Sequence, residues 1–262
     1  MHCQVESRGA GPIRYVFCHG LFGRGRNWTS IARRLEPDGC LLLDLPDHGQ
    51  ASRSQSFSYA NLVAALTEVL EELAGTDFTL VGHSMGGRAV MLTALARPDL
   101  VPRLVVEDIG PAPTPVGPLR QTADALAGLE LAGLQSRRQA DRQLASALPD
   151  PALRAFLLSG LQPDPKDGWR WVFNLELLRR DLDRIMDWPD PGPTEPYPGA
   201  CLWLLGAQSG AVPPASAVRM GQLFPRLRTV RLDPAGHWVH ADLPDQFAAA
   251  LRQFTDQTRS ET

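Results

Sequence analysis

The chain has 262 residues, of which 44% are hydrophobic and 21% are charged, and its formal net charge at pH 7 is −3. This length and composition suffice for one large hydrophobic core. The small negative charge provides no attraction for nucleic acid or for an anionic membrane surface, so we expect neither as a partner.

Cysteine spacing and the N-terminal sequence restrict the setting further. The 4 cysteines lie at wide, irregular intervals, which fits neither a zinc site nor a disulfide framework and predicts reduced thiols. Residues 1–11 lack the apolar region of a secretory signal. No run approaches the roughly 20 apolar residues that a membrane span requires. The sequence therefore predicts a cytoplasmic protein without a membrane span.

Short β-prone runs alternate with segments of helical periodicity, which is typical of a parallel sheet covered by helices. In chain order we predict a strand at 13–18, a helix at 28–35, a strand at 40–45, a helix at 59–73, a strand at 78–81, a helix at 88–96, strands at 104–107 and 201–205, a helix at 215–224, a strand at 229–232 and a helix at 245–255. Ser58 is a suitable N-cap for the helix at 59–73.

The alternation stops between residues 111 and 199, where no strand-like run appears and helical patterns dominate. Proline-rich stretches at 111–115 and 189–198 bound this segment. We therefore predict an α/β core formed by residues 1–111 and 200–262, with a helical cap formed by residues 112–199. Within the cap, helices are expected near 126–134, 138–148, 151–161 and 172–186.

Aromatic residues are concentrated toward the end of the predicted cap. They could line a substrate pocket or hold the cap onto the core, and both roles stay open for each residue taken singly. The candidate pocket residues are Phe22, Trp169, Trp171 and Trp238.

The sequence Gly82-His83-Ser84-Met85-Gly86-Gly87 joins the apolar run 78–81 to the helix-prone segment 88–96. A strand, a sharp turn and a helix are the context of a nucleophile elbow, in which glycines permit the close approach of the chain on either side of a strained serine. A glycine-rich turn that merely connects two elements is the structural alternative. The flanking context favours Ser84 as a nucleophile.

A serine hydroxyl needs a base to take its proton, and the base is expected later in the chain. His237 follows the run 229–232 through the turn Asp233-Pro234-Ala235-Gly236, which places it beyond the carboxyl end of the last strand. Ligands bind at that edge of open parallel sheets. His240, three residues later, is the main rival.

An oxyanion formed during acyl transfer requires two backbone N–H donors. One is expected from Met85, the residue after the nucleophile, at the start of its helix. The other is expected from the turn His19-Gly20-Leu21-Phe22-Gly23. Leu21 is our first choice and Phe22 the alternate, while His19 can shape the turn.

The third member of the predicted triad is an orienting carboxylate. Capped hydrolases commonly carry it after the strand that follows the cap, but residues 205–212 contain no carboxylate, and Ser209 stands in the expected place. Asp108, at the end of the preceding strand, keeps the chain order of nucleophile, acid and base. Glu107 should face the other way, because side chains alternate along a strand. A structural role for Asp108 as a cap of loop N–H groups is the alternative, and Ser209 is a possible fourth member.

Several motifs recur in order and together resemble the α/β-hydrolase family, and more narrowly the small YbfF-type esterases. They are Cys18-His19-Gly20-Leu21-Phe22-Gly23, Asp44-Leu45-Pro46-Asp47-His48-Gly49, Gly82-His83-Ser84-Met85-Gly86-Gly87, Asp108-Ile109-Gly110-Pro111 and Gly236-His237-Trp238-Val239-His240. The resemblance implies an α/β fold with an eight-stranded, mostly parallel sheet and an inserted helical cap. It also implies carboxylic-ester hydrolysis, with acyl-CoA thioesters as further candidate substrates, and an acid at Asp108.

The leading hypothesis is a serine hydrolase that cleaves a small-molecule ester or thioester through an acyl-enzyme, with no metal and no cofactor. A cofactor-free lyase or carbon–carbon hydrolase is a second hypothesis, suggested by residues 44–49 and Arg88. A catalytically silent ligand-binding relative is a third. The natural substrate and the oligomeric state stay open at this point.

Overall fold

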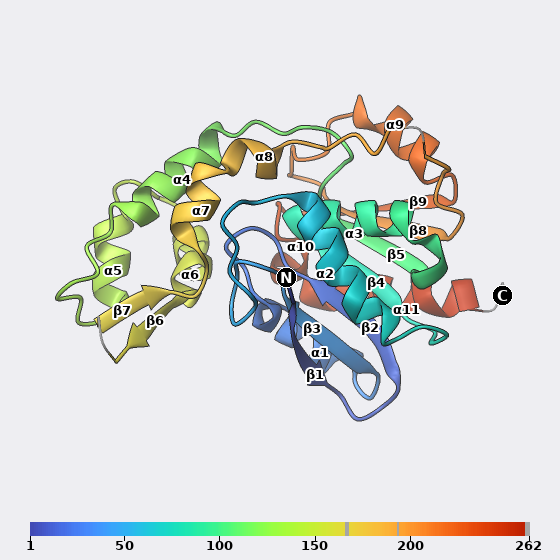
Figure 1. Cartoon of the computed structure of the whole chain (residues 1–262), viewed down its shortest axis with the longest axis horizontal. Helices are drawn as coiled ribbons and strands as arrows, with labels where there is room; N and C mark the ends of the chain where they lie inside the picture. The colour runs from blue at the N-terminus through green and yellow to red at the C-terminus, as the bar shows by residue number, and fades with distance from the viewer. Residues whose placement is uncertain (166–167, 193, 260–262) are drawn as a thin grey trace.

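The computed structural model describes residues 1–165, 168–192 and 194–259 (Figure 1). At its centre is a seven-stranded sheet in the order β1-β3-β2-β4-β5-β8-β9. The strands are β1 (Gln4–Arg8), β2 (Ile13–Cys18), β3 (Gly39–Asp44), β4 (Thr79–His83), β5 (Arg103–Glu107), β8 (Ala200–Gly206) and β9 (Leu227–Leu232). Every neighbouring pair is parallel except β1 with β3. The expected α/β class is confirmed, with seven strands in place of the eight that the resemblance implied.

The middle of the sheet is covered on both faces. Every residue of β4, β5 and β8 is buried, as expected for parallel strands between two helical layers. The helices of the core are α1 (Thr29–Leu35), α2 (Tyr59–Glu71), α3 (Met85–Ala96), α9 (Ser216–Leu223), α10 (Val239–Asp242) and α11 (Pro244–Arg259), with short 3-10 turns η1 (Gly25–Trp28) and η2 (Pro98–Leu100). Buried side chains of α2, α3 and α9 pack on one face, and those of α1, α10 and α11 on the other.

Local sequence explains where the long core helix α2 begins. Ser58 has an extended backbone, and its hydroxyl oxygen accepts the N–H of Asn61 at 3.2 Å. This bond satisfies one of the N–H groups that a first helical turn leaves free.

Within the described residues, no helix is both long and apolar enough to cross a membrane.

The chain between β5 and β8 forms a separate group of elements, which lies to the left of the sheet in Figure 1. We call residues 112–199 the insert. It contains α4 (Gly117–Ala127), α5 (Arg137–Leu144), α6 (Pro151–Ser159), β6 (Leu161–Asp164), β7 (Gly168–Trp171), α7 (Leu175–Arg180) and α8 (Leu182–Met186).

Two expectations about the insert are wrong. It is not purely helical, because β6 and β7 pair as an antiparallel ribbon. Each of these strands has only four residues and Pro163 interrupts the first, so no alternating pattern is visible in the sequence. The helix expected at 126–134 lies earlier, since α4 ends at Ala127 and Gly128 follows it.

Arg88 of α3 ties both ends of the insert to the core. Its guanidinium donates to the carbonyl of Ile185 at 2.9 Å, to the carbonyl of Ala112 at 2.9 Å and to the hydroxyl of Thr114 at 3.0 Å. Arg88 is only 1% exposed. Because Ala112 and Thr114 begin the insert and Ile185 lies near its end, one side chain fixes the two crossings between insert and core.

We therefore expect Arg88→Met to lower the free energy of unfolding by about 2 to 4 kcal/mol, because it removes a buried guanidinium and leaves the partly buried acceptors at Ala112 and Thr114 without this donor. Urea denaturation followed by fluorescence measures the change. The matched control is Arg179→Met, which removes an ion pair to Asp124 whose side chains are each 50% exposed and should cost less than about 0.5 kcal/mol. Equal losses for the two variants would contradict this account of Arg88.

Candidate active site

Ser84 occupies a sharp turn between β4 and α3. Its backbone has φ 52° and ψ −117°, a conformation that is strained for a residue with a side chain. The neighbouring glycines are required by close packing: a Cβ on Gly86 would lie 2.4 Å from the carbonyl oxygen of His19, and one on Gly82 would lie 2.5 Å from the carbonyl oxygen of Gly86. The turn that the sequence predicts is therefore present, with Ser84 partly exposed at its tip.

Asp108 and His237 meet at the carboxyl edge of the sheet. His237 Nδ1 lies 2.7 Å from Asp108 Oδ2. Asp108 Oδ1 accepts the N–H of Gly206 at 3.0 Å, and the hydroxyl of Ser209 donates to Oδ2. The Asp108 side chain is 2% exposed and that of His237 is 31% exposed. Since a buried carboxylate accepts the Nδ1 proton, the other nitrogen, Nε2, is left free to act as a base.

The remaining contact of a triad, from serine to histidine, is not closed. In the described chain the Ser84 hydroxyl has no hydrogen-bond partner. The residue before it, His83, is nevertheless close to the base: the ring centroids of His83 and His237 are 4.7 Å apart. Catalytic hydrogen bonds often tighten only when substrate binds.

The turn after β2 distinguishes between the two candidate oxyanion donors. The N–H of Phe22 donates to His48 Nε2 at 3.3 Å, whereas the N–H of Leu21 has no acceptor among the described residues. Leu21 is therefore the better placed of the two. Met85 is the first residue of α3, so its N–H has no partner within the helix.

Two buried histidines hold this turn in shape. His19 Nε2 accepts the N–H of Leu45 at 3.0 Å while its Nδ1 donates to the carbonyl of Gly20 at 2.8 Å. His48 Nδ1 donates to the carbonyl of Pro46 at 3.0 Å, which leaves Nε2 to accept from Phe22. Burial lowers the pKa of His19 and holds that of His48 well below its usual value, so both rings are neutral and keep these roles.

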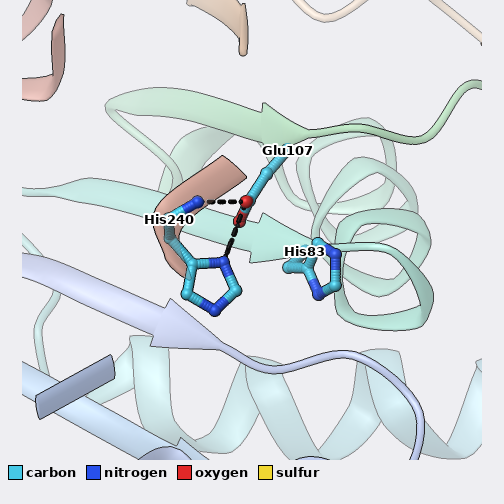
Figure 2. A group of neighbouring side chains, drawn as sticks. All are labelled: His83, Glu107 and His240. Carbon is cyan, nitrogen blue, oxygen red and sulfur yellow. Dashed lines mark hydrogen bonds and ion pairs between the residues drawn. The ribbon is translucent and has the colours of Figure 1, made fainter. Parts of the chain in front are cut away.

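His240, the rival base, belongs to a different cluster. Its backbone N–H and its Nδ1 both contact Glu107 oxygens at 2.8 Å, and Figure 2 shows this pair with His83 beside it. Glu107, His83 and His240 are 0%, 4% and 8% exposed. These three residues, which we call the back cluster, are also the residue types that bind metals, and their candidate ligand atoms lie within 4.8 Å of one another. His240 makes no contact with Asp108, which favours His237 as the base.

The candidate pocket aromatics have different surroundings. The rings of Phe22 and Phe173 pack with their centroids 5.1 Å apart, and Phe173 stacks on Trp171 with a centroid distance of 5.2 Å. The oxyanion turn therefore contacts the insert. Trp238 packs against Phe156 of α6 at 5.6 Å. Trp169 donates its indole N–H to the carbonyl of Leu134 at 2.6 Å, within the insert. That contact favours a structural role for Trp169.

Residues 15–250 match the model of a family described as "Alpha/beta hydrolase family". The chain belongs to this α/β-hydrolase family. Its relatives include the sn-1-specific diacylglycerol lipase ABHD11 of Mus musculus, 38% identical over 91% of this chain and 80% of the relative. Esterase YbfF of Escherichia coli is 32% identical over 91% of each protein.

Solved structures of α/β-hydrolases agree with the fold. A marine microorganism esterase superposes with a TM-score of 0.91 at 27% identity, over 97% of this chain and 99% of that one. The expected resemblance to YbfF-type esterases is thus confirmed.

Two glycine substitutions test how tightly the turn around Ser84 is packed, one inside that turn and one control in an open helix. Gly86→Ala should destabilise the protein by about 1 to 3 kcal/mol, because its Cβ meets backbone that cannot yield cheaply. Gly221→Ala, inside α9 with no atom within 4 Å of its Cβ, should stabilise it by about 0.5 to 1 kcal/mol. Urea unfolding of both variants measures this, and a neutral Gly86→Ala would refute the tight elbow.

Proposed function

We propose that this α/β-hydrolase is a serine carboxylesterase that works through an acyl-enzyme, with Ser84 as nucleophile, His237 as base and Asp108 as the acid that orients it. The observation that carries the proposal is the 2.7 Å contact between His237 Nδ1 and a buried Asp108 carboxylate. This contact lies at the carboxyl edge of the sheet, where the strained turn also presents Ser84. The relatives named as esterases and lipases support a carboxylesterase-type hydrolase.

In the proposed reaction His237 Nε2 takes the proton of the Ser84 hydroxyl as its oxygen attacks the ester carbonyl. The negative charge on the former carbonyl oxygen is stabilised by the backbone N–H groups of Leu21 and Met85. When the ester C–O bond breaks, the leaving alcohol receives the proton from His237. Water then attacks the acyl-enzyme with His237 again as base, which releases the acid and restores Ser84.

Ser209 is the proposed fourth member of this site. Its hydroxyl donates to the same Asp108 oxygen that contacts His237. A third donor, the N–H of Gly206, binds the other oxygen. This arrangement supplies the buried carboxylate with hydrogen-bond donors and aims it at His237, which is the task of a triad acid.

We further propose that residues 112–199 act as a cap over the site and residues 1–111 and 200–262 as the core, and that the substrate binds between them. Contacts across the boundary support it: Phe22 of the oxyanion turn packs on Phe173 of the insert with ring centroids 5.1 Å apart, and Trp238 beside His237 packs on Phe156 of α6 with ring centroids 5.6 Å apart. Aromatic side chains beside the oxyanion turn and the His237 loop suit the carbon chain of an ester or thioester. A cytoplasmic location is part of the proposal, supported by four cysteines without a disulfide partner in the described chain.

The lyase hypothesis has less support than the esterase. It was suggested by residues 44–49 and Arg88, but the Arg88 guanidinium donates to Ile185, Ala112 and Thr114 of the insert. The silent-relative hypothesis is disfavoured because the elbow, the Asp108–His237 contact and an unengaged Leu21 N–H coexist.

The acyl-enzyme predicts burst release of p-nitrophenol from short-chain acyl esters. Ser84→Ala should lower kcat by about 10⁶-fold, as for removal of a protease nucleophile. Stopped-flow absorbance checks both results, and a panel of acyl chain lengths that includes CoA thioesters then defines the substrate class. Equal rates for wild type and Ser84→Ala would overturn the proposed function.

The acid can be tested separately. Asp108→Asn should lower kcat by about 10⁴-fold, because the asparagine stabilises the wrong imidazole tautomer. Ser209→Ala removes one hydrogen bond to a charged group and should cost about 10- to 100-fold. Steady-state kinetics of the two variants measure the ranking, and the reverse order would show that the acid is misassigned.

A further inference from the structure

Behind the proposed triad, each of its members has a polar neighbour in the sequence that turns to the other side of the sheet. His83 precedes Ser84, Glu107 precedes Asp108, and His240 follows His237 by three residues. His83 and Glu107 are register partners on the parallel strands β4 and β5, so their side chains lie side by side on one face. Figure 2 shows them with His240 on that face.

The back cluster contacts the loop of His237 at two points. His83 Nε2 donates to the backbone carbonyl of His237 itself, at 3.0 Å. Glu107 binds both the backbone N–H and the ring of His240, at the start of α10. The loop is therefore held at the carbonyl of His237, whose imidazole must face Ser84, and again three residues later at His240.

The protonation states suit this task. Burial lowers the pKa of His83 to about 3. The ring is therefore neutral near neutral pH, and its Nε2–H donor to His237 is kept. Burial opposes ionisation of Glu107, but its contacts with the ring and the backbone N–H of His240 outweigh it and hold the Glu107 pKa below its usual value. Glu107 is thus a carboxylate that binds both donors of His240.

We propose that the back cluster positions His237: His83 and Glu107 fix the backbone of the catalytic loop from behind, so that Asp108 needs only to orient the ring. This inference rests on the proposed function. The three are positioning residues, because each acts through His237 or its loop. A displacement of about 1 Å at a reacting group can cost on the order of 100-fold in rate, so the backbone hold adds to what the Asp108 contact supplies.

The contacts favour this role over a metal site. Both Glu107 oxygens already accept from His240, and His83 Nε2 is engaged with His237. Metal binding would require these bonds to break.

The test compares two substitutions at one position. His83→Leu removes the donor to the His237 carbonyl, and we expect kcat for p-nitrophenyl ester hydrolysis to fall about 10- to 100-fold with little change in KM. His83→Gln keeps an N–H donor of similar reach and should stay within about 3-fold of wild type. The low-field proton resonance of His237 Nδ1–H should shift or broaden in His83→Leu and not in His83→Gln.

Two further variants keep the result interpretable. Thr79→Val lies on the same strand and loses a buried hydrogen bond to Thr255 of 3.1 Å at the far end of the sheet, so it should lower stability while kcat per folded molecule stays unchanged. If His83→Leu does not fold, Glu107→Gln replaces it, with an expected loss in kcat of about 10-fold.

Wild-type kcat in His83→Leu, or in Glu107→Gln where His83→Leu does not fold, with an unchanged His237 Nδ1–H resonance, would overturn the proposal while leaving the esterase function intact. Loss of wild-type activity after dialysis against a chelator, with recovery on adding Zn²⁺, would also overturn it in favour of a metal site. An inactive wild type, by contrast, would refute the proposed function itself.

Discussion

Asp108 leaves strand β5 with a φ of 48°, and in that conformation its carboxylate accepts hydrogen bonds from three separate segments: Gly206 at the end of β8, Ser209 in the turn that follows, and His237 after β9. A buried carboxylate is tolerable only when donors surround it. The sheet supplies them because β5, β8 and β9 are adjacent and parallel, so their carboxyl ends meet. A serine at position 209 fits this arrangement, since it donates to the acid where a second carboxylate would repel it.

Backbone strain is concentrated at the same edge. In the described chain the non-glycine residues with positive φ are Phe22, Asp47, Ser84 and Asp108. Such conformations cost about 1 to 3 kcal/mol each and persist only where the surroundings hold them. Two of these residues directly follow β4 and β5, whose residues are all buried. The rigid middle of the sheet therefore supports the strained turns that present the serine and the acid.

Sequence reasoning succeeded where a local pattern reflects a local structure. The Ser84 turn lies between an apolar run and a helix, and the approach of Asp108 to His237 follows from parallel strands that end at one edge. It failed for β1, because Gln4–Arg8 is an edge strand with little apolar content, and for the ribbon of β6 and β7. The alternation of side chains indicated that Glu107 faces away from Asp108, but not that it meets His240, because α10 is a four-residue helix without detectable periodicity.

The two faces of the sheet edge impose opposite demands on their polar groups. On the catalytic side, Ser84 and Leu21 keep unpaired groups, because a substrate must provide the missing partners. On the other side Glu107 and His240 are buried and satisfy each other, because a half-satisfied buried network would cost more than an apolar one. His83 connects the faces, since its ring belongs to the closed side while its hydrogen bond reaches the backbone of His237. The hydrogen-bonded back cluster can thus hold the catalytic loop of His237 in place without taking part in the reaction.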